Sequence, residues 1–212
     1  MKELIQGYRR FHSEVFPQKR QLYQSLADGQ SPKYLFITCC DSRINPVEFT
    51  STEPGDLFSE RSIGNIIPLP HTFETESSAS IEFAVGALKV KHIIICGHSN
   101  CGAMKALLNP ESLKELPNVA AWIANSGLTR ESVMKKYPGL EGDELLDATV
   151  HENVIQQLEH LKQQPSVAKA LKEGVLGVHG WVFEVERGRL VEYDESSGGF
   201  LPLLEAHSAT LE

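Results

Sequence analysis

Two short apolar segments constrain the fold of this 212-residue chain more than any other feature. Residues 34–38 and 92–96 are rich in β-branched and aromatic side chains, and an apolar helical periodicity over 78–89 separates them. Such runs are typical of buried strands, and a strand–helix–strand order is typical of a parallel sheet covered on both faces. The sequence therefore predicts an α/β fold, a three-layer domain with a mostly parallel central β-sheet flanked by helices.

Metal-binding side chains follow both predicted strands directly. Cys39-Cys40-Asp41-Ser42-Arg43 comes after the first strand, and Gly97-His98-Ser99-Asn100-Cys101 comes after the second. Because ligands bind outside the carboxyl ends of parallel strands, we expect the two segments to meet there. Two thiolates and one imidazole, from Cys39, His98 and Cys101, are ligands that suit Zn²⁺. For His98-x-x-Cys101 taken alone, chance spacing is the alternative explanation.

Asp41 and Arg43 stand two residues apart, so their side chains can point the same way at an extended strand end. An arginine that holds a carboxylate keeps it ionised and oriented. Such a carboxylate can accept a hydrogen bond from a metal-activated water, or it can bind the metal itself and exclude water. A purely structural ion pair is the alternative.

The four cysteines indicate the cellular compartment, and the net charge argues against some classes of binding partner. Cysteines near a histidine indicate metal binding rather than disulfides in a reducing compartment, whereas Cys96 and Cys40 are expected to be structural. The net charge of -8 argues against nucleic acid or an anionic membrane as partner. No signal-peptide pattern and no apolar stretch of about 20 residues occur, so we expect a cytoplasmic location.

No internal repeat or linker divides the chain, so one domain is expected over residues 1–212. Residues 1–28 are predicted to form an N-terminal helical arm of two pieces, broken near Pro17, and Ser77 or Ser78 is a candidate cap for the helix over 78–89. Residues 196–212 are expected to form a loop or weak C-terminal tail. Further elements are a long amphipathic helix over 146–161 and strands near 57–58, 176–183 and 190–193, with a hairpin turn at Gly188.

Four motifs occur in one order: Cys39-x-Asp41-x-Arg43, Arg61-x-x-Gly64-Asn65, Glu82-Phe83-Ala84 and Gly97-His98-x-x-Cys101-Gly102. Together they resemble the β-class carbonic anhydrases, most of all the bacterial and cyanobacterial branch. The likeness extends from about residue 4 to about residue 193 and includes His179-Gly180-Trp181.

The resemblance implies an enzyme for the reversible hydration of CO₂ to bicarbonate and a proton, in which a zinc-bound hydroxide attacks CO₂. It implies one zinc ion per subunit on Cys39, His98 and Cys101, a catalytic pair of Asp41 and Arg43, and a contribution to substrate binding from Gly102. Hydrolysis of carbonyl sulfide or carbon disulfide on the same fold is one alternative. A zinc-binding relative without turnover is another, and the intact Asp–Arg pair argues against it.

The family has an open form, with water at the fourth metal position, and a closed form in which the Asp binds zinc. The closed form goes with a bicarbonate site built from Trp, Arg and Tyr, and the corresponding residues here are Phe36, Arg61 and Phe183. Because two of those polar groups are missing, we predict the open form, with Asp41 off the metal at neutral pH. Ser62 after Arg61 and the segment 71–78 also depart from the family pattern and affect the pocket rather than the zinc ligands.

The resemblance further implies a homo-oligomer, a dimer or dimer of dimers, whose N-terminal helices embrace the partner. The apolar face of Leu4, Tyr8 and Phe11 fits this, and it equally fits packing on its own domain. Carboxysomal members carry a long C-terminal extension, and this chain ends soon after its last predicted strand. Carboxysomal association is therefore not supported by the sequence.

Overall fold

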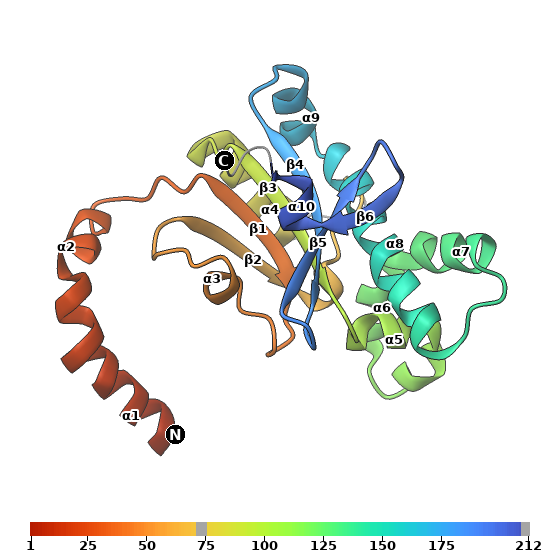
Figure 1. The fold of residues 1–212 in the computed structure, drawn as a ribbon, viewed down its shortest axis with the longest axis horizontal. Coiled ribbons are helices and arrows are strands. Elements are labelled where there is room, and N and C mark those ends of the chain that lie inside the picture. The colour runs from red at the N-terminus through yellow and green to blue at the C-terminus, as the bar shows by residue number, and fades with distance from the viewer. Residues whose placement is uncertain (71–75, 209–212) are drawn as a thin grey trace.

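A single six-stranded sheet forms the centre of the computed structural model, which describes residues 1–70 and 76–208 (Figure 1). The strands are β1 (Tyr34–Cys39), β2 (Leu57–Ser62), β3 (His92–His98), β4 (Gly177–Glu184), β5 (Arg189–Asp194) and β6 (Gly199–Pro202). Their order is β2-β1-β3-β4-β5-β6; the first four are parallel, and β5 and β6 continue antiparallel. The predicted mostly parallel α/β fold is confirmed.

Helices surround the sheet and account for most of the remaining chain. The α-helices are α1 (Lys2–Arg10), α2 (Phe16–Leu26), α3 (Pro46–Phe49), α4 (Glu76–Phe83), α5 (Gly102–Leu108), α6 (Pro117–Ile123), α7 (Gly127–Lys136), α8 (Gly142–Lys162), α9 (Pro165–Lys172) and α10 (Leu203–Ala206). Two π-helical turns (Phe11–Val15, Ala84–Leu88) and three 3₁₀ turns (Ile63–Asn65, Pro110–Leu113, Ala124–Ser126) complete the set.

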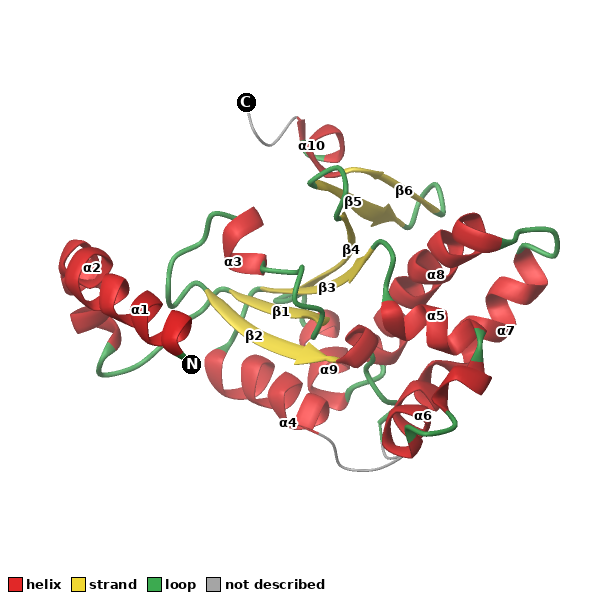
Figure 2. Cartoon of the chain, turned by 90° about the horizontal axis from the view of Figure 1, so that it is seen from below, coloured by secondary structure: helices red, strands yellow, loops and turns green. Residues whose placement is uncertain are grey.

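The two faces of the sheet are covered unequally. Leu35, Ile37 and Ile95 point to one face and are fully buried against apolar side chains of α4, α8 and α9. On the other face, Phe36 and Ile94 contact mainly aromatic side chains, and the short helix α3 lies over β1 and β2 (Figure 2). A cavity of about 560 Å³ remains over this second face. The helical layer predicted there is therefore thin within one chain.

The N-terminal arm extends away from the rest of the molecule (Figure 1). The predicted break near Pro17 is wrong, because the helix continues through it. A proline cannot donate to the carbonyl four residues earlier, and here the π-helical turn Phe11–Val15 widens the helix just before Pro17. Such a turn relieves the clash that a proline makes inside a regular α-helix.

The C-terminal segment is more ordered than predicted. From Ser196 we expected a loop or weak tail, but β6 pairs with β5 and α10 follows it. The signal was missed because β6 is short and contains Pro202, which a sheet tolerates only at an edge. The predicted tail residues 209–212 and the loop residues 71–75 lie outside the described residues.

Two smaller findings concern helices. Ser77 and Ser78 lie inside α4 and so do not precede it as caps; the Ser77 hydroxyl donates to the Glu60 carboxylate instead. The long amphipathic helix is confirmed as α8, with Val154 and Leu161 fully buried.

Across residues 1–70 and 76–208, none of the helices has the length and apolar character needed to span a membrane.

Candidate metal centre

The candidate ligands meet because the strands that carry them are neighbours. Cys39 is the last residue of β1 and His98 the last of β3, and these strands pair in parallel with Thr38 opposite Cys96. Cys101 follows three residues later, at the N-cap of α5. The ligand atoms of Cys39, His98 and Cys101 all lie within 4.8 Å of one another, and all three residues are buried. The predicted meeting of the two motifs at the sheet edge is confirmed.

The two thiols affect each other strongly. The hydrogen bond with Cys101 outweighs burial and lowers the pKa of Cys39, with further help from His98 and the Gly64 N–H. The same bond, followed by burial, raises the pKa of Cys101. The pair thus favours one thiolate even before a cation is considered, which suits a site built for a positive ion.

His98 is oriented for ligation. Its Nδ1 lies 3.0 Å from the Ser99 carbonyl oxygen, which can only accept, so Nδ1 carries the proton. Its Nε2 is fully buried and has no hydrogen-bond partner among the described residues. A metal-binding histidine commonly anchors its other nitrogen to a carbonyl in this way, which leaves a lone pair free for the ion.

Asp41 and Arg43 form a two-pronged ion pair beside the cluster. Arg43 Nε donates to Asp41 Oδ1 at 2.9 Å, and Nη2 donates to Oδ2 at 2.8 Å. Nη2 also donates to the Asn100 carbonyl at 3.1 Å, which ties the pair to the second motif. These bonds hold the pKa of Asp41 well below its ordinary value. Asp41 Oδ2 lies 3.9 Å from His98 Nε2, so an ionised carboxylate faces the ligand cluster.

Two supporting residues were part of a motif but received no role from the sequence. The Gly64 N–H donates to Cys39 Sγ at 3.3 Å. Gly64 has φ +71°, and an added Cβ would lie 2.9 Å from that of Ala103, so only glycine fits. Arg61 donates to the carbonyl oxygens of Cys39 (2.9 Å) and Asp41 (2.7 Å) and so fixes the backbone between them. These contacts cross 20 or more residues, which spacing alone does not reveal.

Aromatic rings fill the region where a second bicarbonate site would require polar groups. Phe36 is 1 % exposed and packs edge-on against Trp181. Phe183 stacks on Phe49 with ring centroids 4.7 Å apart. The guanidinium of Arg61 is engaged through Nε and Nη2 with backbone carbonyls, so Phe36 and Phe183 place apolar rings where the closed form has polar side chains.

The remaining predicted positions are also located. Gly102 is the first residue of α5 and is exposed next to Cys101. Cys96 is fully buried, and burial raises its pKa to about 12. Cys40 is exposed while its neighbour Cys39 is buried. The expected structural role thus holds for buried Cys96, whereas it is wrong for Cys40, which lies just beyond the end of β1 and is exposed.

Comparison with known proteins identifies this arrangement. The family model described as carbonic anhydrase matches residues 34–190, which include all three candidate ligands. The chain belongs to the carbonic anhydrase family. It is 42% identical over 198 residues to a carbonic anhydrase of Synechococcus elongatus, covering 93% of this chain and 73% of the relative.

Similar solved structures assign this carbonic anhydrase to the β class. The structure of the β-carbonic anhydrase CcaA superposes with a TM-score of 0.94 at 40% identity and covers 95% of this chain and 91% of that one. A chain from the crystal structures of two tetrameric β-carbonic anhydrases of Sordaria macrospora is also similar. It has a TM-score of 0.82 at 29% identity, and the match covers 90% of this chain and 95% of that one. The predicted family is confirmed.

This carbonic anhydrase also contains a histidine network that spacing did not predict. His92 Nδ1 lies 3.0 Å from His179 Nε2, and His179 Nδ1 lies 2.8 Å from Glu192 Oε1. His207 Nε2 lies 2.5 Å from the other oxygen of Glu192. His179 and His207 therefore share the Glu192 carboxylate, and His92 joins the network through His179. The network connects β3, β4 and β5 to the C-terminal segment.

Proposed function

We propose that this protein is a zinc-dependent enzyme that catalyses the reversible hydration of CO₂ to bicarbonate and a proton. The observation that carries the proposal is the meeting of two thiols and one imidazole beside a carboxylate that an arginine holds in place. Membership of the carbonic anhydrase family supplies the reaction.

The ligand atoms in the proposal are Cys39 Sγ, His98 Nε2 and Cys101 Sγ. The donor set fits zinc, because one nitrogen and two sulfur atoms are typical of its sites and three protein ligands leave one position open. The buried and unpartnered Nε2 of His98 supports this fit. When bound, zinc supplies a Lewis acid that makes a water molecule nucleophilic near neutral pH.

Asp41 and Arg43 are the proposed catalytic pair. The two bonds from Arg43 keep the Asp41 carboxylate ionised and fix its direction, so it can accept a hydrogen bond from the reacting water and orient that water. Asp41 held in this way is kept off the metal, which supports the open form. The aromatic packing around Phe36 and Phe183 supports it too, since these two positions carry no polar group to complete a bicarbonate site.

The Gly102 N–H, at the positive end of α5, is the proposed donor to a substrate oxygen. Because this exposed residue has no side chain, a small substrate can approach its backbone closely. An added Cβ would meet nothing within 4 Å, so the fold does not require glycine here and only the close approach of substrate does.

A stopped-flow CO₂ hydration assay on zinc-loaded protein tests the function. We expect turnover by the wild type, loss of both turnover and zinc in Cys101→Ser, and retention of both in Cys40→Ser, the matched control at an exposed cysteine. Absence of turnover at full zinc occupancy would point to a non-catalytic relative. Faster hydrolysis of carbonyl sulfide than hydration of CO₂ would favour the other substrate class.

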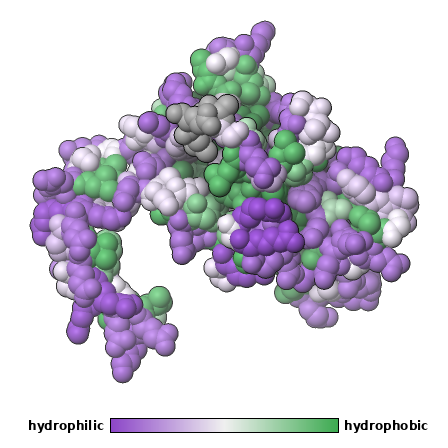
Figure 3. Space-filling model, viewed as in Figure 1, coloured by the Kyte–Doolittle hydropathy of each residue, from purple (hydrophilic) through white to green (hydrophobic). Residues whose placement is uncertain are grey.

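We also infer a homo-oligomer, with residues 1–212 forming one domain and residues 1–28 an arm that reaches a second copy. Helix α1 has no buried residue, and Leu4, Ile5 and Tyr8 are 74%, 59% and 65% exposed. Hydrophobic residues are visible on the arm among hydrophilic ones (Figure 3). The partly uncovered sheet face offers a complementary apolar surface. The tetrameric Sordaria macrospora relatives are consistent with this assembly.

A cytoplasmic location completes the proposal. All four cysteines are free thiols, as expected for a reducing compartment.

A further inference from the structure

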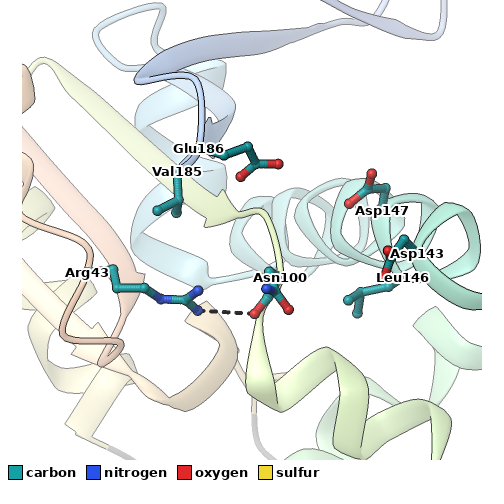
Figure 4. A pocket seen from close by; sticks show the side chains of 7 residues that line it. All are labelled: Arg43, Asn100, Asp143, Leu146, Asp147, Val185 and Glu186. Atoms are coloured by element: carbon teal, nitrogen blue, oxygen red, sulfur yellow. Dashed lines mark hydrogen bonds between the residues drawn. The ribbon is translucent and has the colours of Figure 1, made fainter.

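A cavity opens beside Arg43 of the Asp41–Arg43 pair. It has a volume of about 320 Å³ and is lined on one side by Arg43 and Asn100. Facing them are Asp143 and Asp147 of α8, and Glu186 from the turn between β4 and β5 (Figure 4). The cavity is therefore a polar space that starts at the catalytic pair and leads along α8.

A second cavity continues from the first. It has a volume of about 80 Å³ and shares Asp147 and Glu186 with the larger one. It also contacts Ser99, whose hydroxyl donates to Glu186 at 2.7 Å, and it reaches His151 of α8. A water molecule occupies about 30 Å³ in the liquid, so both cavities can hold water. Arg43 and His151 thus line two neighbouring cavities that have the carboxylates of Asp147 and Glu186 in common.

His151 is built to take up and release a proton. Its ring is held by stacking on Phe200, with centroids 4.3 Å apart, and it is half-buried. Burial lowers the pKa of His151, while the carboxylates of Asp147, Glu184 and Glu152 oppose that shift. Glu186 and Arg187 complete the charged groups around this cavity. The net effect is a lowered pKa, so the ring is held in its neutral, proton-accepting form.

The other histidines in the described part of the chain are placed differently. His160 is 1 % exposed and bound to the Ile67 carbonyl, and His12 is exposed on the arm. His92, His179 and His207 line the cavity on the opposite face of the sheet, with Phe36 and Trp181. Among the described histidines, and apart from the candidate ligand His98, His151 is thus the one whose cavity shares lining residues with the cavity at Arg43.

We propose that His151 is the proton-transfer residue of this enzyme and receives the proton through the two cavities that join it to Arg43. The inference rests on the proposed function. Each hydration event forms one bicarbonate and releases one proton. The proton moves along water in the cavities to a ring nitrogen of His151, which becomes an imidazolium beside Asp147 and Glu186. A buffer base then removes the proton and restores the neutral ring, so each cycle converts CO₂, water and one buffer base into bicarbonate and the protonated buffer.

The kinetic test compares His151→Ala and His151→Gln with the wild type at low and high buffer concentrations. Proton release follows bicarbonate formation, so we expect kcat in low buffer to fall about tenfold or more while kcat/KM stays unchanged. Added imidazole should restore kcat, because a small base replaces the missing ring. His12→Ala, at an exposed histidine of the arm, should leave both constants unchanged. A parallel fall in kcat and kcat/KM, or an unchanged kcat in low buffer, would overturn the proposal.

A second readout does not depend on turnover. In the wild type, the His151 ring signals followed by NMR should titrate, with a midpoint below the ordinary value for histidine because burial lowers the pKa. Asp147→Asn should shift that midpoint to lower pH, since a carboxylate that favours the imidazolium is removed. A His151 ring whose signals do not titrate would also contradict the proposal. Inactive wild-type protein would instead contradict the proposed function, so the two failures are distinguishable.

Discussion

The guanidinium of Arg43 holds both carboxylate oxygens of Asp41, with Nε–Oδ1 at 2.9 Å and Nη2–Oδ2 at 2.8 Å. A third bond joins Nη2 to the Asn100 carbonyl, between His98 and Cys101. One side chain therefore orients the carboxylate and connects the two ligand-bearing segments. This relationship makes Arg43 the most informative position to change in the catalytic pair.

Arg43→Lys should lower kcat/KM for CO₂ by about 10²-fold or more, because an ammonium cannot reproduce the planar two-pronged contact that positions Asp41. The three metal ligands are untouched, so zinc content should remain at wild-type level. Stopped-flow kinetics and elemental analysis of the same preparation measure the two effects. Arg130→Lys, at an exposed arginine, is the control. An unaltered kcat/KM in Arg43→Lys would show that catalysis does not require the two-pronged contact between Arg43 and Asp41.

Gly64→Ala should destabilise the protein by about 1–3 kcal/mol and weaken zinc binding. An alanine at φ +71° is strained, and its Cβ would lie 2.9 Å from the Cβ of Ala103. Relief of that clash would displace the N–H that donates to Cys39 Sγ. Denaturant unfolding and competition with a zinc chelator measure the two quantities.

Gly86→Ala is the matched control for this change. Gly86 lies in a helical segment and an added Cβ would meet nothing within 4 Å, so we expect unaltered or slightly higher stability. Equal behaviour of the two variants would mean that the backbone at Gly64 is not under the constraint described here.

Glu192→Gln should lower the free energy of unfolding at pH 7 by about 1–3 kcal/mol, since two histidines lose their anionic partner. Burial alone would raise the pKa of Glu192, but the hydrogen bonds from His179 and His207 outweigh it and lower that pKa from 4.5 to about 2. A lowered folded-state pKa stabilises the protein above pH 4.5, and this contribution disappears as the pH falls from 4.5 toward 2.

The stability difference between wild type and Glu192→Gln should therefore narrow over that acidic range. Urea unfolding at fixed protein concentration and decreasing pH measures it. Glu144→Gln, at an exposed glutamate of α8, should show little difference at any pH. A difference that stays constant down to about pH 3 would exclude ionised Glu192 as its cause.

Replacing Leu4 and Tyr8 together by Asp should shift the protein toward its monomer mass of 23.5 kDa. The two apolar side chains are exposed in the single chain, and carboxylates there would oppose burial in an interface. Light scattering coupled to gel filtration gives the mass. Gln6→Asp, on the other side of the same helix, should leave the assembly intact. Identical masses for all variants would remove the arm from the proposed interface.

Local patterns were enough to predict the main elements and the candidate ligands. The apolar runs before Cys39 and after Lys91 form β1 and β3, and the periodicity over Leu146–Leu161 forms α8. These predictions held because strand and helix periods are set by the backbone, and burial follows from them. Two predictions failed because the surrounding structure overrode a local sequence signal. Pro17 does not break the N-terminal helix, because a π-helical turn accommodates it. The segment after Ser196 is not a loop, because it pairs with β5 as an edge strand.

The sequence by itself determined the chemistry of this protein: two thiols, an imidazole and an Asp–Arg pair at the carboxyl ends of two parallel strands. Only the tertiary structure decided how that chemistry is supported. The Gly64 N–H on Cys39, the Arg61 bonds to the backbone and the cavities from Arg43 to His151 join segments far apart in the chain. Such contacts depend on how whole helices and strands pack, because the position of a residue along the chain does not specify which distant residues it will contact.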